Sequence, residues 1–331
     1  CMDKVLSDKM RVVGFLCTVM VVFRHALNLQ AFGIDSMGRS YASFVENGIS
    51  KVTEIAVPYF FVVSGFFFFR KTFYGKGEYW EMLKKKIRTL FIPFLFWNIV
   101  GCIPLLIMHQ FVYETHWWMY GQQILNSEWN GVLWYVRDIM TMMLLAPLYS
   151  WLFVVNNKWL YFVVTALLFL HWLPVDCGWI SSEGTFFFFV GGVLQRYSRM
   201  LKCQMPTWLL LFLLSVWIFS SFAYPRFWPI HRYNTLLGLI VFWQLASYVP
   251  LRYMPKLVCL SAYSFFIYVV HADIVKAMKV GIAHLAYGNE MVALTSYVVT
   301  TLGAILIALG VGKFLNKHIP SFFYIITGGR A

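Results

Sequence analysis

Long apolar stretches recur along the whole chain, and they limit its possible folds more than any other feature. The chain has 331 residues, of which 60% are hydrophobic and 12% are charged, whereas a soluble domain carries about 25% charged residues. Each stretch is about 18 to 22 residues long, the length an α-helix needs to cross about 30 Å of hydrocarbon. The sequence therefore predicts an all-α polytopic membrane protein.

About ten of these stretches are expected to cross the membrane as helices in one bundle. The expected spans are residues 12–32, 52–69, 89–109, 131–155, 159–174, 185–198, 206–224, 234–250, 257–279 and 291–312. The longest connecting segments are 33–51, 70–88 and 110–130, which we expect to be loops. None is long enough for a soluble domain, so residues 1–331 are predicted to form a single integral membrane domain.

The distribution of basic residues predicts the orientation. The net charge is +13, from 27 Lys and Arg against 14 Asp and Glu. Most of these basic residues fall on the cytoplasmic side if the N-terminus is cytoplasmic, so the positive-inside rule favours N-in and C-in. We expect a multi-pass protein of the cell membrane whose basic segments meet membrane lipids and not nucleic acid.

The first span carries polar groups that a lipid-facing helix lacks. Arg24, His25 and Asn28 lie within residues 12–32. A charged side chain at that depth costs about 2.5 kcal/mol or more, so such residues usually face a bundle interior and mark function. A hydrogen-bonded packing histidine is the structural alternative for His25, and Arg24 is expected to reach the outer interface.

Counting the helical rise predicts two more polar groups at the depth of His25. With about 1.5 Å per residue, His25 and His271 both lie about 20 Å from the cytoplasmic face. Arg137 lies near the same height on an inward-running span. A snorkelling Arg137, or one paired with Asp138, is the structural alternative. A metal site is not expected, because the six cysteines and the histidines lack metal-ligand spacing.

The segment 70–88 is strongly basic. It includes Arg70, Lys71, Lys84, Lys85 and Arg88, on the predicted cytoplasmic side. Contact with anionic lipid and a cationic entrance for a phosphorylated metabolite are both open interpretations. Just before it, Ser64-Gly65 permits either close helix packing or a backbone that lines a cavity.

Four segments together resemble the membrane acyltransferase-3 family, whose members acylate cell-envelope carbohydrates. They are Val21-Val22-Phe23-Arg24-His25, residues 57–66 (VPYFFVVSGF) followed by the basic segment and Leu90-Phe91-Ile92-Pro93, residues 133–137 (LWYVR), and residues 263–271 (YSFFIYVVH). The similarity runs from about residue 11 to residue 273. Gly14 departs from the family pattern, which often has an arginine there, and Arg11 is the candidate to replace it.

The resemblance implies an enzyme. Family members take acyl groups, most often acetyl, from cytoplasmic acyl-CoA and transfer them to carbohydrate hydroxyls. His25 matches the family's essential histidine. A bacterial cytoplasmic membrane is the location that the resemblance implies.

We therefore expect an integral membrane O-acyltransferase with acyl-CoA as donor and a carbohydrate or glycolipid as acceptor. His25, as general base or acyl carrier, is expected to act with Arg137 and His271. The residues expected to hold the donor are Arg11, Ser64, Arg70, Lys71, Lys84, Lys85 and Arg88. The outer groups expected to meet sugar are His231, Arg232, Trp118 and Trp228. A transporter or flippase of glycolipid or polysaccharide is the alternative, and an inactive sensor or scaffold is a third.

Overall fold

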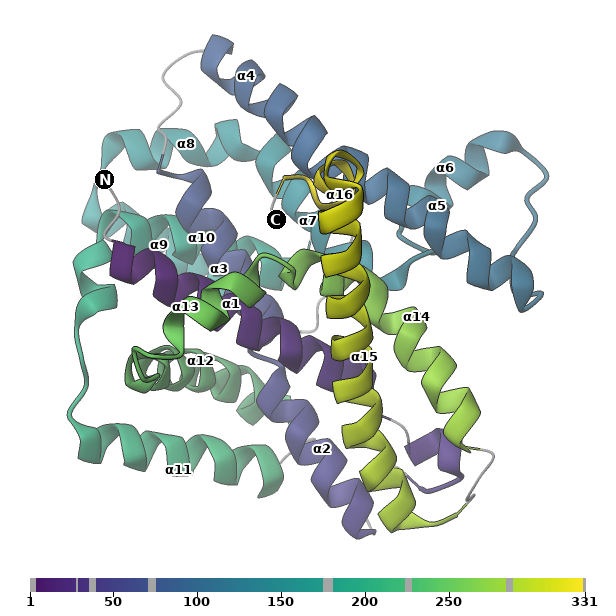
Figure 1. Cartoon of the computed structure of the whole chain (residues 1–331). Helices are drawn as coiled ribbons and strands as arrows, with labels where there is room; N and C mark the ends of the chain where they lie inside the picture. Colours follow the sequence, from purple (N-terminus) through teal and green to yellow (C-terminus); the bar gives the residue numbers. More distant parts are fainter. Residues whose placement is uncertain are drawn as a thin grey trace. The chain divides into compact units, whose positions relative to one another are not determined.

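The computed structural model describes residues 4–27, 29–35, 40–70, 76–174, 181–223, 228–283 and 288–329. These residues are largely helical, and none of them lies in a strand. The α-helices are α1 (Lys4–His25), α2 (Tyr41–Thr53), α3 (Ala56–Phe68), α4 (Lys76–Lys86), α5 (Ile92–Ile107), α6 (Trp117–Leu125), α7 (Trp134–Leu144), α8 (Ala146–Val155), α9 (Lys158–Trp172), α10 (Ser182–Arg196), α11 (Thr207–Ala223), α12 (Trp228–Leu245), α13 (Met254–Ser261), α14 (Ser264–Ala283), α15 (Glu290–His318) and α16 (Pro320–Thr327) (Figure 1). Short helical turns are η1 (Leu29–Phe32), η2 (Ile87–Phe91), η3 (Gly131–Leu133), η4 (Ser198–Lys202) and η5 (Ala246–Tyr248).

Several helical segments are long and apolar enough to cross a membrane. Among the described residues there are four, at Lys4–Phe32, Tyr41–Phe68, Gly77–Ile107 and Glu290–His318, or up to six if each of two bent helix pairs is one span. This confirms the predicted all-α membrane class. Every expected span overlaps at least one helix, but the number of ten stays a prediction.

Three segments expected to be loops contain helices. They are 33–51, which contains most of α2, 70–88, which contains α4, and 110–130, which contains α6. Helix α2 begins after Ser40, whose side chain accepts a hydrogen bond from the Ser43 amide, as an N-cap residue does. Its buried face packs against α1, α11 and α12. The residues of α2 therefore form an amphipathic helix. A search for long apolar stretches does not detect this helix, because the hydropathy of its residues is low.

In two expected spans a proline interrupts the helical hydrogen bonding, because it lacks the N–H that would continue the helix. Pro58, in the first turn of α3, cannot donate to the Glu54 carbonyl, and α2 ends at Thr53. Pro147 likewise leaves the Met143 carbonyl without its helical donor, and the Tyr79 hydroxyl lies 3.4 Å from that oxygen while it donates to Leu144 O at 2.9 Å. The helices on either side of this break are bent by 58°. The expected continuous span 131–155 is therefore wrong in detail. The same holds for 257–279, because Met254–Ser261 and Ser264–Ile282 are bent by 65°, whereas the expected span 52–69 lies almost entirely within the candidate span Tyr41–Phe68.

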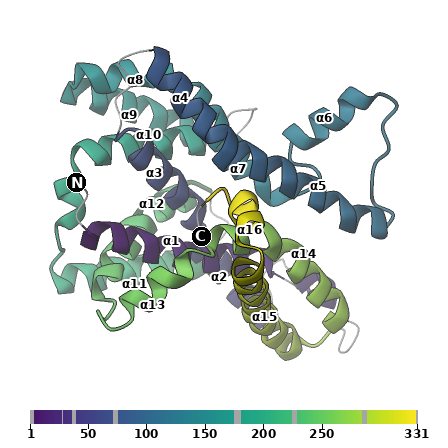
Figure 2. The same cartoon turned by 45° about the horizontal axis from the view of Figure 1, so that its top comes forward.

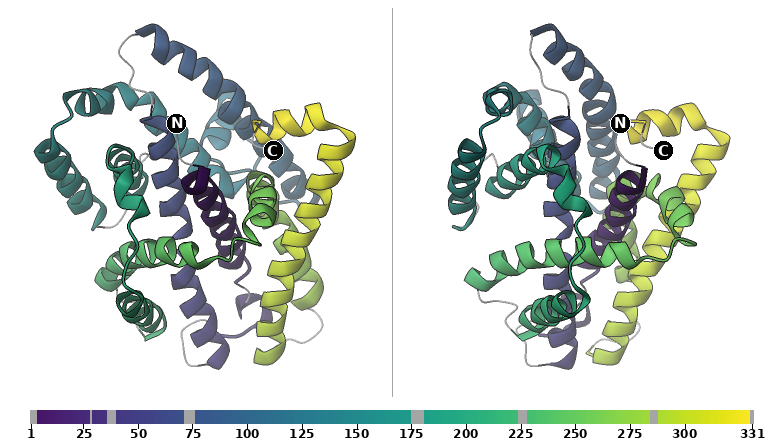
Figure 3. Two further views of the ribbon diagram at one scale, coloured as in Figure 1. Left: turned by 60° about the vertical axis from the view of Figure 1, so that its left-hand side comes forward. Right: turned by 90° about the vertical axis from the view of Figure 1, so that its left-hand side faces the viewer.

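The described residues form two compact units. The first comprises Cys1–Phe60 and Arg199–Gly312. In it, α1 packs against α2, α13 and α14, around an apolar cluster of Phe15, Val22, Ala26, Ile267, Val275, Tyr297, Ala304, Ile305 and Ala308. Figure 3 shows the long helix α15 beside α14. Asn234 joins α12 to α11 by a hydrogen bond of 2.8 Å to Ser221 Oγ.

The second unit comprises Phe61–Ser198 and Lys313–Ala331. Its helix α10 packs against α7 and α9, and α16 packs against α5 (Figure 2). Trp97 on α5 donates to Ile326 O on α16 at 2.8 Å. Two glycines bring backbones together: an added Cβ on Gly65 would lie 1.9 Å from Phe188 O, and one on Gly191 would lie 2.1 Å from Val62 O. Small residues therefore set the spacing between α3 and α10.

Candidate functional site

His25 is the last residue of α1. The expected span 12–32 instead places it in the middle of a helix. At the C-terminus of α1, backbone carbonyls have no N–H donor within the helix. A side chain from another helix supplies the hydrogen bonds instead. Lys279 Nζ on α14 donates to His25 O at 2.8 Å and also to Leu27 O. An ammonium group at a helix C-terminus satisfies these carbonyls and complements the helix dipole. His25 thus lies at an ordered helix end, and the residue is exposed.

The structure brings His25 and His271 together. Their ring centroids are 4.9 Å apart, with an angle of 67° between the ring planes. His271 lies on α14 and is fully buried. Its Nδ1 lies 2.7 Å from Tyr268 O, and since a carbonyl only accepts, Nδ1 carries the hydrogen. In a neutral ring Nε2 then has a free lone pair, and it has no hydrogen-bond partner within the described part of the chain.

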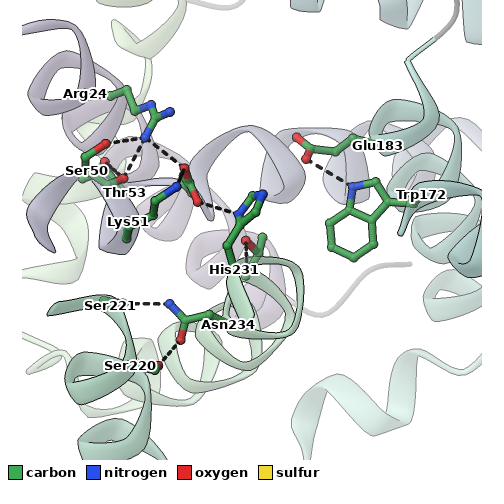
Figure 4. Close-up of polar contacts among 12 residues, drawn as sticks. Arg24, Ser50, Lys51, Thr53, Trp172, Glu183, Ser220, Ser221, His231 and Asn234 are labelled. Carbon is green, nitrogen blue, oxygen red and sulfur yellow. Dashed lines mark hydrogen bonds and ion pairs between the residues drawn. The ribbon is translucent and has the colours of Figure 1, made fainter. Parts of the chain in front are cut away.

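Arg24, next to His25, belongs to a charged network (Figure 4). Its Nη1 donates to Glu54 Oε1 at 3.1 Å and to Ser50 O at 3.0 Å. Lys51 Nζ donates to the same Glu54 oxygen at 2.8 Å, and His231 Nδ1 lies 3.0 Å from Glu54 Oε2. Glu54 thus holds Arg24 against the end of α2, and the expected reach of Arg24 to the outer interface stays a prediction.

Glu54 is the residue of this network that the sequence reasoning missed. It lies at the break between α2 and α3, within the expected span 52–69. The available signal was the rule already applied to His25, that an ionisable residue inside an apolar span has a partner or a function. One carboxylate here joins α1, α2 and α12.

The residues expected to contact sugar differ in their surroundings. His231 and Arg232 lie in the first turns of α12, where Arg232 is buried. Trp118 is exposed on α6 of the second unit. The side chain of Trp228 lies outside the described residues. Of the four, His231 belongs to the network around Glu54.

Arg137 lies on α7 in the second unit and pairs with its neighbour. Its Nε and Nη2 donate to Asp138 Oδ1 at 3.0 and 2.9 Å. Asp138 is buried, so the guanidinium supplies the charge compensation that a buried carboxylate needs. The paired alternative for Arg137 is therefore correct. A shared layer of Arg137 with the two histidines stays a prediction.

Ser64 lies in a packed part of the second unit, whereas the described basic residues expected to hold the donor there are exposed. Ser64 Oγ lies 3.2 Å from the Tyr135 hydroxyl, next to the tightly packed Gly65. Arg70, Lys84, Lys85 and Arg88 are exposed. Lys71 lies outside the described residues. This exposure suits a solvated or lipid-facing anion-binding surface.

Arg11 lies on α1 of the first unit and is exposed. Gly14, one turn later, faces Tyr59, whose ring carbon would lie 3.8 Å from an added Cβ. The Tyr59 hydroxyl donates to Met10 O at 2.8 Å. Tyr59 therefore packs alongside the turn where the family pattern has arginine, and the role of Arg11 stays a prediction. Within the described ranges, no three His, Cys, Asp or Glu residues gather as metal ligands.

These features define a multi-pass helical membrane protein with an imidazole pair at the end of its first helix. The family model described as an acyltransferase domain, that of the acyltransferase-3 family, matches residues 12–311. The chain therefore belongs to the acyltransferase-3 family and is a membrane acyltransferase. Neither the curated proteins nor the solved structures contain a match to it.

Proposed function

We propose that this acyltransferase moves an acyl group, acetyl by resemblance, from cytoplasmic acyl-CoA to a hydroxyl of a cell-envelope carbohydrate. The observation that carries the proposal is the His25–His271 pair. His25 is the only one of the two that is exposed, whereas His271 is buried beside it. An exposed imidazole in contact with a buried one suits general base or nucleophilic chemistry.

The transfer can be written with His25 as base. The acceptor oxygen bonds to the thioester carbonyl carbon while a ring nitrogen of His25 takes the hydroxyl proton. The carbon–sulfur bond breaks, and the CoA thiolate receives that proton. If His25 carries the acyl group instead, its nitrogen first displaces CoA, and the acceptor hydroxyl then displaces the ring. Both routes yield the ester and CoA with a free thiol.

In either route, the proposed part of His271 is to accept a hydrogen bond from His25 during the reaction. The Nδ1–H of His271 donates to Tyr268 O, so the lone pair of its Nε2 is available to an N–H donor. A hydrogen bond from His25 to this lone pair leaves the other nitrogen of His25 unprotonated. That nitrogen is the one able to take a proton or attack a carbonyl.

Two groups of residues serve the donor in this proposal. Arg70, Lys71, Lys84, Lys85 and Arg88 attract the CoA phosphates, with Ser64 nearer the thioester. Arg11 contributes from the N-terminal half of α1. Arg137 positions donor or acceptor when it leaves its ion pair with Asp138. The topology proposed is ten spans with both termini in the cytoplasm of a bacterial cell.

Replacement of His25 tests the function. His25→Ala in proteoliposomes with acyl-CoA and envelope glycan is expected to lower acceptor-dependent CoA release at least about 100-fold, since general base catalysis contributes that much. The matched control is His171→Ala on α9, an exposed histidine. Undiminished CoA release by His25→Ala would contradict the assignment, and glycan movement without CoA release would favour a transporter.

A further inference from the structure

The network around Glu54 holds more positive than negative charge. Arg24 and Lys51 both bind Glu54 Oε1, and His231 binds the other oxygen. One carboxylate thus faces two permanent cations and an imidazole that can become a third. Glu46, also on α2, is a second carboxylate of this unit and lies within electrostatic range of Lys279 on α14. Among the groups that contact Glu54 directly, positive charge exceeds negative charge.

The donors that face away from Glu54 are available to a ligand. Arg24 uses Nη1 in all of its hydrogen bonds to the described residues, which leaves Nη2 and Nε. His231 uses Nδ1, which leaves Nε2. In Figure 4 these free nitrogens point away from the carboxylate. The side chains are reachable, because 41% of Arg24 and 22% of His231 is exposed, against 14% of Glu54.

We propose that Arg24 and His231, held by Glu54, form a subsite for an oxyanion, a carboxylate or phosphate group, on the carbohydrate acceptor. The proposal rests on the proposed function and narrows its acceptor to an acidic sugar. A guanidinium with two adjacent free N–H groups matches the two oxygens of such a group. The network orients these donors before the ligand arrives, which lowers the entropic cost of binding.

The position of Arg24 in the chain indicates the size of the ligand. Arg24 and His25 are neighbours, with Cα atoms about 3.8 Å apart. Their side chains leave the helix about 100° apart, so a single ion cannot meet both. A sugar ring bearing an oxyanion can place that group on Arg24 while a hydroxyl approaches His25. The subsite and the candidate catalytic residue therefore belong to one acceptor site.

A pair of glycosides that differ in one group tests this subsite. Binding of methyl β-D-glucuronide and methyl β-D-glucoside to the full-length protein in lipid nanodiscs is measured without acyl-CoA. The acid is expected to bind at least about tenfold more tightly than the neutral sugar, since hydrogen bonds to charged groups contribute that much. Inorganic phosphate is expected to compete with the acid, while Arg24→Gln reduces the preference to near one. Lys256→Gln, an exposed lysine on α13, is the control and keeps the preference.

The outcomes separate this proposal from the enzymatic one. Equal or undetectable binding of both glycosides by the wild-type protein overturns the subsite, and so does a preference that survives Arg24→Gln. If Arg24→Gln does not fold, the wild-type protein alone tests the subsite. Preference for the acid together with competition by phosphate supports the subsite, and the absence of either overturns it. Acceptor-dependent CoA release without any preference for the acid overturns the subsite alone. A preference for the acid in a protein that never releases CoA overturns the proposed function alone.

Discussion

At the scale of single residues, the position of His25 depends on α14 as much as on α1. Helix α14 supplies both the ring of His271 and the ammonium of Lys279, so one helix fixes the side chain and the backbone carbonyl of His25. Helical rise from the sequence predicted a common depth for His25, His271 and Arg137, and the structure brings the two histidine rings together. Helical rise did not predict that Lys279 would bind the carbonyls at the end of α1. The expected helix continued to residue 32, so no helix end was expected near His25.

Lys279→Met is expected to destabilise this helix end. It removes the donor to His25 O and Leu27 O, and hydrogen bonds from charged groups are worth about 1.5–3 kcal/mol each. Lys279→Arg retains a cationic donor and is expected to keep most of the stability. Thermal unfolding in detergent measures the effect, and the rate of diethyl pyrocarbonate modification of His25 reports the freed ring. An unchanged modification rate in Lys279→Met would show that Lys279 does not order His25.

At the scale of helices, sequence reasoning located apolar elements better than polar ones. Each expected span overlaps a helix because burial in lipid demands a long apolar run. The helix α2 was missed because Glu46, Asn47 and Lys51 lower the hydropathy of its segment. Glu54, which follows α2 directly, is the carboxylate that joins three helices of the first unit. Polar helices next to spans thus carry charge networks that hydropathy alone cannot reveal.

The Ser64-Gly65 segment has a structural function that substitution can test. Gly65→Ala places a methyl group 1.9 Å from the Phe188 carbonyl oxygen, a backbone atom that cannot rotate away. Overpacking costs about 1–3 kcal/mol, which exceeds the gain of about 1 kcal/mol in helix propensity. Gly310→Ala on α15 is the matched control, since nothing lies within 4 Å of its added methyl. We expect Gly65→Ala to lower the melting temperature and Gly310→Ala to leave it equal or raise it. Equal melting of both variants would contradict the close packing of α3 and α10.

At the scale of the whole chain, the number of membrane crossings separates two topologies. The ten-span prediction counts α9 to α12 as crossings, whereas a six-span interpretation uses the four long segments and two bent pairs. Helix α10 is largely buried within its unit, and α12 carries His231, Arg232 and Asn234. These helices have too little continuous apolar length to settle the count by composition.

Two native cysteines distinguish the topologies. Cys177 lies between the fifth and sixth predicted spans, in a segment outside the described residues, and Cys203 lies exposed after η4. With the other cysteines replaced, ten spans place Cys177 outside and Cys203 inside, whereas six spans keep both inside. A membrane-impermeant maleimide should label Cys177 in intact cells and Cys203 only after permeabilisation. Labelling of Cys177 only in permeabilised cells would contradict ten spans, and the intervening helices would then lie on the cytoplasmic side with the donor.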